Sequence, residues 1–494
     1  MSTALAFKCS THVVDILGNV AGRDQPIMLT AKAIELVSTL DPEVFQNDDV
    51  VFFDPFCKAG EILLACAILR CRARFESNHF SEGFDPLDQE TREAVKDELY
   101  RSNRYFAKAP DERHYRLSLR TFLGNENSHD PAFNHIIRNG DYLSEIDGRL
   151  DRNKFESEFL SMLEYIKSTA GGKKIVAVGN PPYQEADGGF GKSAKSIYDL
   201  FTEQLIENSD ISEFALVIPA RWFGGGKGLD GFRNRMMSSS KIRNLRYFQN
   251  SSEVFPTVDI NGGICFLHFD KNHDEKTNFT DGKFRKTVDF QEFDIIPDDP
   301  MAFALVKKIQ SNWAGKYVGD VAWASKPFGL RTNFFEKNEE LDSEDSTAVP
   351  CLCRGKKIKF ASIDQVIKNK DKIDFWKVSA PAVGGGSKGS RRSTIPLNQI
   401  FGVDKGCITT ETYNIIDVFR EKSQAENLII FLKTDFARYL LGLRKLTQHI
   451  PKDRWNWVPY MDINQQWTDK ALFDFFKITP EEQEHIKTKV KEWS

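Results

Sequence analysis

Apolar residues in the first half of the chain form short continuous runs that alternate with amphipathic stretches. This pattern predicts strands and helices, which we expect at 50–53, 175–178, 214–218, 244–248 and 263–269 for the strands and at 60–75 and 194–207 for the helices. The strands are apolar throughout, which is typical of strands covered by helices on both faces. The order of elements therefore predicts an α/β fold with a largely parallel sheet.

The pattern changes after residue 270. Residues 271–286 are polar and break the alternation of strands and helices, and residues 336–345 (EKNEELDSED) form an acidic stretch typical of an exposed loop. We therefore place a domain boundary near 275, with one domain at 1–275 and a second, mixed α+β domain at 276–494.

Charge is unevenly distributed between these regions. The whole chain of 494 residues has a net charge of −4, which argues against a protein that holds a polyanion by bulk charge alone. Residues 351–410, however, contain twelve Lys and Arg against four Asp and Glu, a net charge of +8, so the rest of the chain carries −12. The second domain thus contains a region suited to phosphate groups.

Several classes of protein are disfavoured. No apolar run reaches the ~18 residues of a membrane span, and residues 1–10 lack the basic and apolar parts of a secretory signal. The eight cysteines are scattered and the nine histidines form no HExxH pair, so we expect reduced cysteines and no metal site. We expect a cytoplasmic protein without a membrane partner.

The sequence Asn180-Pro181-Pro182-Tyr183 follows directly after a predicted strand and Gly179. Two prolines end the strand and fix an extended loop, at the sheet edge where α/β proteins bind ligands. The Asn180 amide oxygen and the Pro181 carbonyl can accept the two hydrogens of a planar amino group, while Tyr183 stacks on it. This arrangement directs the nitrogen lone pair toward an electrophile. The alternative interpretation is a turn that merely ends the strand.

A second feature lies at the end of the first predicted strand. The residues Asp54-Pro55-Phe56-Cys57-Lys58-Ala59-Gly60-Glu61 form a tight turn that opens a helix. A cofactor binds at this position in doubly wound folds.

With these two features the chain resembles the S-adenosylmethionine-dependent DNA adenine-N6 methyltransferases of bacterial restriction–modification systems, over about residues 27–270. The order of the cofactor turn, the catalytic loop and a later recognition domain is that of their gamma class, so the resemblance implies a Rossmann-like class I methyltransferase sheet. It implies Asn180, Pro181, Pro182 and Tyr183 as catalytic residues, with Tyr183 and Phe255 stacking on the target base. It implies contacts with S-adenosyl-L-methionine from Thr30, Asp54, Pro55, Phe56, Cys57, Gly60, Asp111, Asp141 and Asn180.

The chain departs from the family pattern in two places. Lys58 stands where the family usually has the first glycine of the turn, and its backbone must still approach the cofactor. The acid that holds the cofactor ribose is ambiguous: we choose Asp111, with Glu112 and Glu126 as competitors and a helix-capping role as the plainer alternative.

The resemblance implies methylation of adenine N6 in double-stranded DNA, with the base rotated out of the helix. We expect Lys388, Arg391, Arg392, Arg444 and Lys445 to contact DNA. If cleavage accompanies methylation, we expect a separate restriction endonuclease or defence-system subunit as partner, in a bacterial or phage-encoded system.

Three alternatives remain. An RNA or protein-glutamine methyltransferase would use the same loop, because an amide nitrogen poses the same chemical problem, although glutamine-modifying enzymes are more compact. A non-catalytic DNA specificity subunit would be expected to lack the loop or Phe255. A fused nuclease would need a PD…(D/E)xK cluster, which is not apparent.

Overall fold

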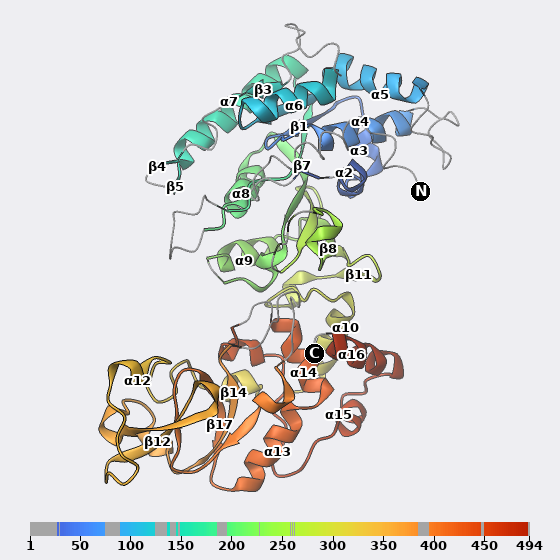
Figure 1. Ribbon diagram of the computed structural model, residues 1–494. Coiled ribbons are helices and arrows are strands. Elements are labelled where there is room, and N and C mark those ends of the chain that lie inside the picture. The colour runs from blue at the N-terminus through green and yellow to red at the C-terminus, as the bar shows by residue number, and fades with distance from the viewer. Residues whose placement is uncertain are drawn as a thin grey trace. The chain divides into compact units, whose positions relative to one another are not determined.

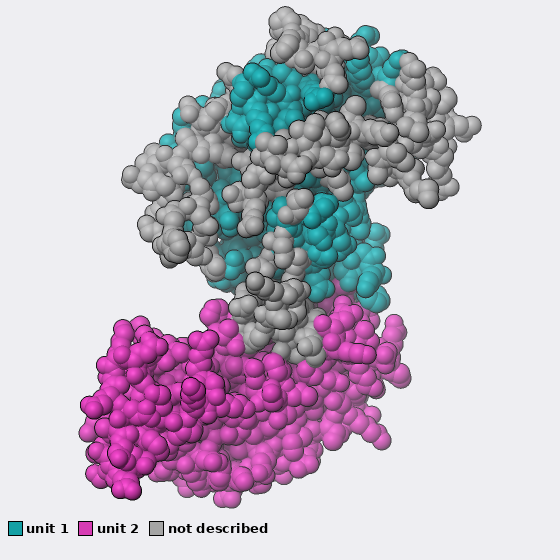
Figure 2. Space-filling view, viewed as in Figure 1, with its two compact units in different colours: residues 1–296 teal, residues 297–494 magenta. Residues whose placement is uncertain are grey.

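The computed structural model describes residues 27–28, 30–74, 89–123, 136–138, 145–146, 149–184, 195–226, 228–256, 258, 260, 262–383, 395–445 and 449–492. The chain divides into two compact units, unit 1 at residues 1–296 and unit 2 at residues 297–494 (Figure 2). Unit 1 extends beyond the boundary near 275 that the sequence predicts, because two further strands pair at the edge of its sheet.

Unit 1 is built on a nine-stranded sheet with the order β11-β10-β8-β9-β7-β6-β1-β2-β3. Figure 1 shows this unit with β1, β3, β7, β8 and β11 labelled. Its strands are β1 (Val50–Asp54), β2 (Tyr105–Ala109), β3 (Ile136–Arg138), β6 (Lys174–Gly179), β7 (Ile211–Pro219), β8 (Ile242–Phe248), β9 (Ile264–Asp270), β10 (Thr277–Thr280) and β11 (Arg285–Val288). The pairs among β3, β2, β1, β6 and β7 are parallel. The five expected strands are confirmed within about three residues at each end.

The sheet departs from an all-parallel arrangement at β9, which lies antiparallel between β7 and β8. The sequence predicted β7, β8 and β9 as strands, but it did not predict that β9 runs antiparallel to the other two. The chain therefore turns back on itself between Phe248 of β8 and Ile264 of β9, which pair directly, since antiparallel neighbours need no crossover helix.

Helices cover both faces of the sheet, as expected from its uniformly apolar strands. They are α2 (Thr30–Val37), α3 (Pro42–Gln46), α4 (Glu61–Arg74), α5 (Gln89–Arg101), α6 (Glu112–Leu123), α7 (Arg152–Ala170), α8 (Tyr198–Glu207) and α9 (Asp230–Ser238). Adjacent residues of β1 show the alternation: Phe52 stacks on Phe45 of α3 at 5.6 Å between ring centroids, whereas Phe53 contacts Phe159 of α7 at 6.1 Å.

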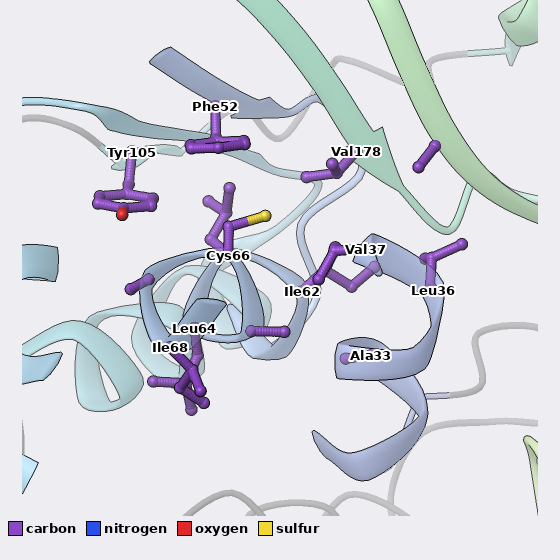
Figure 3. Close-up of a cluster of buried hydrophobic side chains, with 14 of the residues drawn as sticks. Ala33, Leu36, Val37, Phe52, Ile62, Leu64, Cys66, Ile68, Tyr105 and Val178 are labelled. Carbon is purple, nitrogen blue, oxygen red and sulfur yellow. The ribbon is translucent and has the colours of Figure 1, made fainter. Parts of the chain in front are cut away.

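The core on the α4 face is a continuous apolar cluster. Figure 3 shows Phe52 and Tyr105 pointing toward Cys66 of α4, with Leu36 and Val37 of α2 in the same cluster. Phe52 and Tyr105 are fully buried, and their rings stack 5.7 Å apart across β1 and β2. This packing fixes α4, and with it the turn that precedes the helix.

Unit 2 contains two three-stranded sheets, with the orders β13-β12-β16 and β15-β14-β17. Its elements are α10 (Pro300–Ser311), α11 (Val318–Val321), α12 (Phe334–Lys337), β12 (Ala348–Cys353), β13 (Lys357–Ser362), β14 (Trp376–Pro381), β15 (Phe401–Val403), β16 (Ile408–Thr409), β17 (Tyr413–Phe419), α13 (Lys422–Leu432), α14 (Asp435–Arg444), α15 (Asp469–Phe475) and α16 (Pro480–Glu492). Asp299 caps α10 and accepts hydrogen bonds from Tyr439 at 2.8 Å and His485 at 2.6 Å, which joins α10 to α14 and α16. Within the described residues, no helix is long and apolar enough to cross a membrane.

We predict that Phe52→Ala destabilises unit 1 by about 3–5 kcal/mol, because the truncation leaves a cavity between two stacked rings. Leu160→Ala on α7, a site that is 41% exposed, serves as the matched control and should change the free energy of unfolding by less than about 0.5 kcal/mol. Urea denaturation of both variants measures the difference, and equal effects would contradict the packing described above.

Candidate functional site

The turn after β1 is anchored to the neighbouring strand. The Asp54 carboxylate accepts a hydrogen bond from Phe56 N at 2.9 Å, and Cys57 N donates to Lys108 O of β2 at 3.1 Å. All residues from Asp54 to Gly60 are buried. The predicted cofactor turn is therefore a fixed surface at the carboxyl edge of the sheet.

Gly60 ends this turn in a backbone conformation that favours glycine. Its φ is +80°, and a Cβ there would lie 3.0 Å from the ring of Phe122 in α6. Thr121 of α6 donates through Oγ1 to Ala59 O at 2.5 Å. The turn is thus held against α6 as well as β2, and α4 begins immediately after it.

Three charged side chains of the turn are buried together. Burial raises the pKa of Asp54 to about 8 and lowers the pKa of Lys58 to about 8. Burial also raises the pKa of Glu61, whose carboxylate accepts hydrogen bonds from Met28 N at 3.3 Å and Ala59 N at 3.2 Å. The three groups act on one another, because Glu61 also raises the pKa of Asp54 and Lys58 lowers it.

The segment before α2 lies against the same turn. The hydrogen bond from Met28 to Glu61 holds it there, and Ile27 packs with Ala59 and Leu117 in a small apolar cluster. Thr30 follows at the start of α2 and is 4% exposed. The structure thus brings the Thr30 segment to the cofactor turn, although they are 24 residues apart in the sequence.

The end of β6 makes close contact with the end of β1. A Cβ on Gly179 would lie 3.0 Å from Asp54 Oδ1 and 3.2 Å from the ring of Phe56. Asn180 follows at 1% exposure. β1 and β6 are adjacent in the sheet, but the next strand after β1 lies on one side of this pair and the next strand after β6 lies on the other side. The contact therefore lies at a topological switch point.

The NPPY loop continues from Asn180 and is fixed at its far end. Ile197 N donates to Tyr183 O at 3.3 Å, just before α8. On α8, the ring of Phe201 lies 5.0 Å from that of Phe56 in the cofactor turn. The turn and the loop are therefore joined both at Gly179 and through α8.

Phe255 belongs to the large apolar cluster on the α4 face, and Tyr183 packs against that same cluster, so their role in base stacking stays a prediction. The Tyr183 hydroxyl is buried and makes no hydrogen bond within the described part of the chain. Phe255 is 1% exposed. Its ring is therefore covered in this structure.

Asp111 caps α6 through His114. Its carboxylate accepts a hydrogen bond from His114 N at 2.9 Å, and both of its oxygens lie 2.7 Å from His114 Nδ1. Burial opposes ionisation, but these hydrogen bonds outweigh it and lower the pKa of Asp111. Half of the Asp111 side chain remains exposed, so the carboxylate can accept further hydrogen bonds. Its ribose-binding role stays a prediction beside the capping role.

Other predicted site residues lie outside the described residues. These are Asp141 and Glu126, which the sequence offers as candidates for cofactor contacts, and the basic residues Lys388, Arg391 and Arg392.

Arg444 and Lys445 differ from the expectation that they contact DNA. Both are 3% exposed. Arg444 donates to Asp453 O at 2.9 Å, and its guanidinium lies 4.8 Å from the centroid of the Trp457 ring. An arginine in this position stabilises the end of α14 and does not reach phosphate in the described state.

Sequence reasoning missed the roles of three residues. Glu61 ties the segment before α2 to the turn, His114 holds the Asp111 carboxylate, and Gly179 permits the contact of the two strand ends. An acid at the first position of a helix and a glycine at the end of a strand are weak signals, because each is common without such a role.

A mixed sheet of this order, with the antiparallel β9 inserted and with the turn and loop at its carboxyl edge, is a Rossmann-like class I methyltransferase sheet. Residues 86–255 match the family model described as Eco57I restriction-modification methylase. The match contains the NPPY loop and Phe255. The expected resemblance to restriction–modification adenine methylases is thus confirmed for this part of the chain.

A relative from Mycoplasma pneumoniae (strain ATCC 29342 / M129 / Subtype 1), named "Uncharacterized adenine-specific methylase", is 31% identical over 134 residues. The alignment covers 26% of this chain and 31% of the relative. The chain therefore spans about a third of the length of this curated relative.

Two solved structures show a weaker similarity. The Type IIL restriction-modification enzyme MmeI in complex with DNA has a TM-score of 0.41 and 11% identity, over 98% of this chain and 74% of that one. A nuclease-deletion mutant of the Type ISP enzyme LlaGI, bound to a DNA substrate mimic, has a TM-score of 0.46 and 10% identity, over 90% of this chain and 47% of that one. The fold assignment rests on the strand order and not on these scores.

We predict that the ligand-free protein loses stability as the pH rises from about 5 to 7.5. Because the pKa of Asp54 is about 8 in the folded state, against an ordinary value of 3.8, the folded state holds an extra proton in this range. Asp54→Asn should therefore flatten the dependence of the melting temperature on pH.

Asp48→Asn is the matched control. Asp48 is partly desolvated, but Arg74, Arg104 and Arg70 lower its pKa, so its contribution is lost only as the pH falls toward 4 and below. The control should be less stable than wild type with the same slope between pH 5 and 7.5. A slope unchanged by Asp54→Asn would show that Asp54 is ionised in the folded protein.

Proposed function

We propose that this protein is a DNA methyltransferase that transfers a methyl group from S-adenosyl-L-methionine to the N6 amino group of adenine. The observation that carries the proposal is the contact at Gly179, which places the NPPY loop beside the buried turn after β1. The cofactor and the target amino group would then meet where the two strands end.

The residues of the turn suit this cofactor. S-adenosyl-L-methionine supplies an electrophilic methyl group on a positively charged sulfur. Asp54 and Glu61 are buried together with Lys58, and burial raises the pKa of both acids, so a cationic ligand would favour their ionised forms. Thr30 follows the segment that Met28 ties to Glu61, and Thr30 and Asp111 would hold the methionine and ribose parts.

Asn180 and Pro181 would orient the target nitrogen. The amide oxygen of Asn180 and the carbonyl of Pro181 would each accept one N–H of the amino group. The nitrogen lone pair is then withdrawn from the ring and directed at the methyl group, and the same acceptors stabilise the positive charge that develops on the nitrogen. The two prolines keep the loop rigid, so little reorganisation is needed during transfer.

The target base would leave the helix to reach this loop. A base within a duplex cannot approach a buried asparagine, so adenine must rotate out of the stack. Tyr183 would stack on one face, and Phe255 would pack against the other after the β8–β9 segment moves.

Unit 2 would hold the duplex. Its region 351–410 carries a net charge of +8, and Lys388, Arg391 and Arg392 lie within it. A restriction endonuclease or another defence-system subunit would be a separate partner.

The test is to incubate the full-length protein with unmethylated duplex DNA and S-adenosyl-L-methionine, digest the DNA to nucleosides, and identify the product by mass spectrometry. We expect N6-methyldeoxyadenosine. Label in RNA, or on glutamine in protein, with none in DNA would contradict the proposed substrate.

Asn180→Ala should lower the rate of methyl transfer at least about a hundredfold, the usual effect of removing one transition-state hydrogen-bond partner. Calorimetry should show that the cofactor affinity changes less than the rate. Asn272→Ala is the matched control, because this asparagine is exposed in the same unit after β9, and it should retain full activity. Full activity of Asn180→Ala would refute the role of the amide.

A further inference from the structure

Unit 2 contains a cleft of about 880 Å³ at the edges of its two small sheets. Its walls come from the β12–β13 turn, the end of β14, the 3₁₀ turn η8 (Leu397–Gln399) and the residues that precede β17. This cleft lies in unit 2 alone and is separate from the turn and loop of unit 1.

A lysine braces the cleft across its two sheets. Lys356 Nζ donates to Asn398 O at 2.9 Å and lies 4.3 Å from the centroid of the Phe401 ring. The backbone N of Lys356 also donates to Tyr413 Oη at 3.2 Å. These contacts fix η8 relative to the β12–β13 turn, so side chains on η8 are presented from a rigid backbone.

Two adjacent amides, Asn398 and Gln399, project from η8. Asn398 is exposed and Gln399 is half-buried, and both line the cleft. Neither side-chain amide makes a hydrogen bond within the described residues. An amide offers a donor and an acceptor side by side, which is the pattern that matches the major-groove edge of adenine.

The charges and apolar groups around the cleft also suit a duplex. Arg354 is exposed at the rim and can reach a phosphate, and it belongs to the region of net charge +8. The acid Glu411 is compensated, because it accepts a hydrogen bond from Thr332 N at 3.1 Å and lies 3.9 Å from Lys326 Nζ. Val383 on the cleft wall is 51% exposed, so its side chain can make an apolar contact with a thymine methyl group.

We propose that this cleft reads base edges of duplex DNA, with Asn398 and Gln399 as the residues that determine sequence preference and Arg354 as a phosphate contact. The proposal rests on the proposed function, since it takes the duplex to be the substrate of unit 1. It adds the site and the residues of recognition.

The experiment is a binding selection from random duplex DNA with the full-length protein, followed by sequencing of the bound fraction and by titration of the preferred duplex against a scrambled one. No methyl transfer is needed for this readout. The double variant Asn398→Ala/Gln399→Ala should reduce the affinity ratio of preferred to scrambled duplex at least about fivefold. Its affinity for scrambled DNA and its salt dependence should stay as in the wild type.

The matched control is Gln465→Ala/Gln466→Ala, another adjacent pair of exposed amides in unit 2 that lies outside the cleft. This pair should keep the wild-type preference. Arg354→Ala should weaken binding to all duplexes equally and reduce the slope of log affinity against log salt by about one. Thermal melting confirms that each variant is folded.

An unchanged preference in Asn398→Ala/Gln399→Ala would overturn the proposal, as would the absence of any preference in the wild type or tighter binding of single-stranded RNA. The proposed function fails separately. A protein that selects a duplex sequence through this pair but does not methylate adenine supports the cleft and refutes the methyltransferase. A protein that methylates adenine in DNA, but whose sequence preference survives the double variant, supports the methyltransferase and refutes the role of the cleft.

Discussion

The site depends on one steric constraint, the contact between the end of β6 and the end of β1. Gly179 leaves little room for a side chain, since a Cβ there would lie 3.0 Å from Asp54 Oδ1 and 3.2 Å from the ring of Phe56, and these groups would have to shift. The loop that begins at Asn180 is therefore placed beside the buried acids of the turn. The turn itself is held in place by its hydrogen bonds to β2 and α6. The contact of Phe56 with Phe201 also joins it to α8.

The sequence predicted the central strands well because strands buried on both faces are continuous apolar runs. It did not predict the direction of β9, because a run of apolar residues carries no information about its neighbours in the sheet. The short strands β10 and β11 were missed for a related reason: Arg285–Val288 is mostly exposed, so its polar residues resemble a loop. These edge strands explain why unit 1 extends to residue 296 and not to 275.

The turn and the loop could be identified from the sequence because they are local and directly follow strands. The roles of Glu61, His114 and Gly179 depend on residues far away in the chain, so the sequence could not predict them. The basic cluster at Arg444 and Lys445 illustrates the reverse error. Its charges suggested an exposed surface that contacts DNA, whereas Arg444 is buried in unit 2 and stacks on Trp457. The spacing of these residues in the sequence does not reveal this contact.

The most direct test of this account is the rate of methyl transfer to unmethylated DNA by Gly179→Ala in a single turnover. The added methyl group would displace Asp54 or Phe56, so we predict at least about a tenfold loss of rate, in line with the cost of small displacements at reacting groups. Gly231→Ala, at a helical glycine where an added Cβ would meet no other atom within 4 Å beyond its own helix, should transfer methyl groups at the wild-type rate. A wild-type rate in Gly179→Ala would contradict the claim that this contact aligns the turn with the loop.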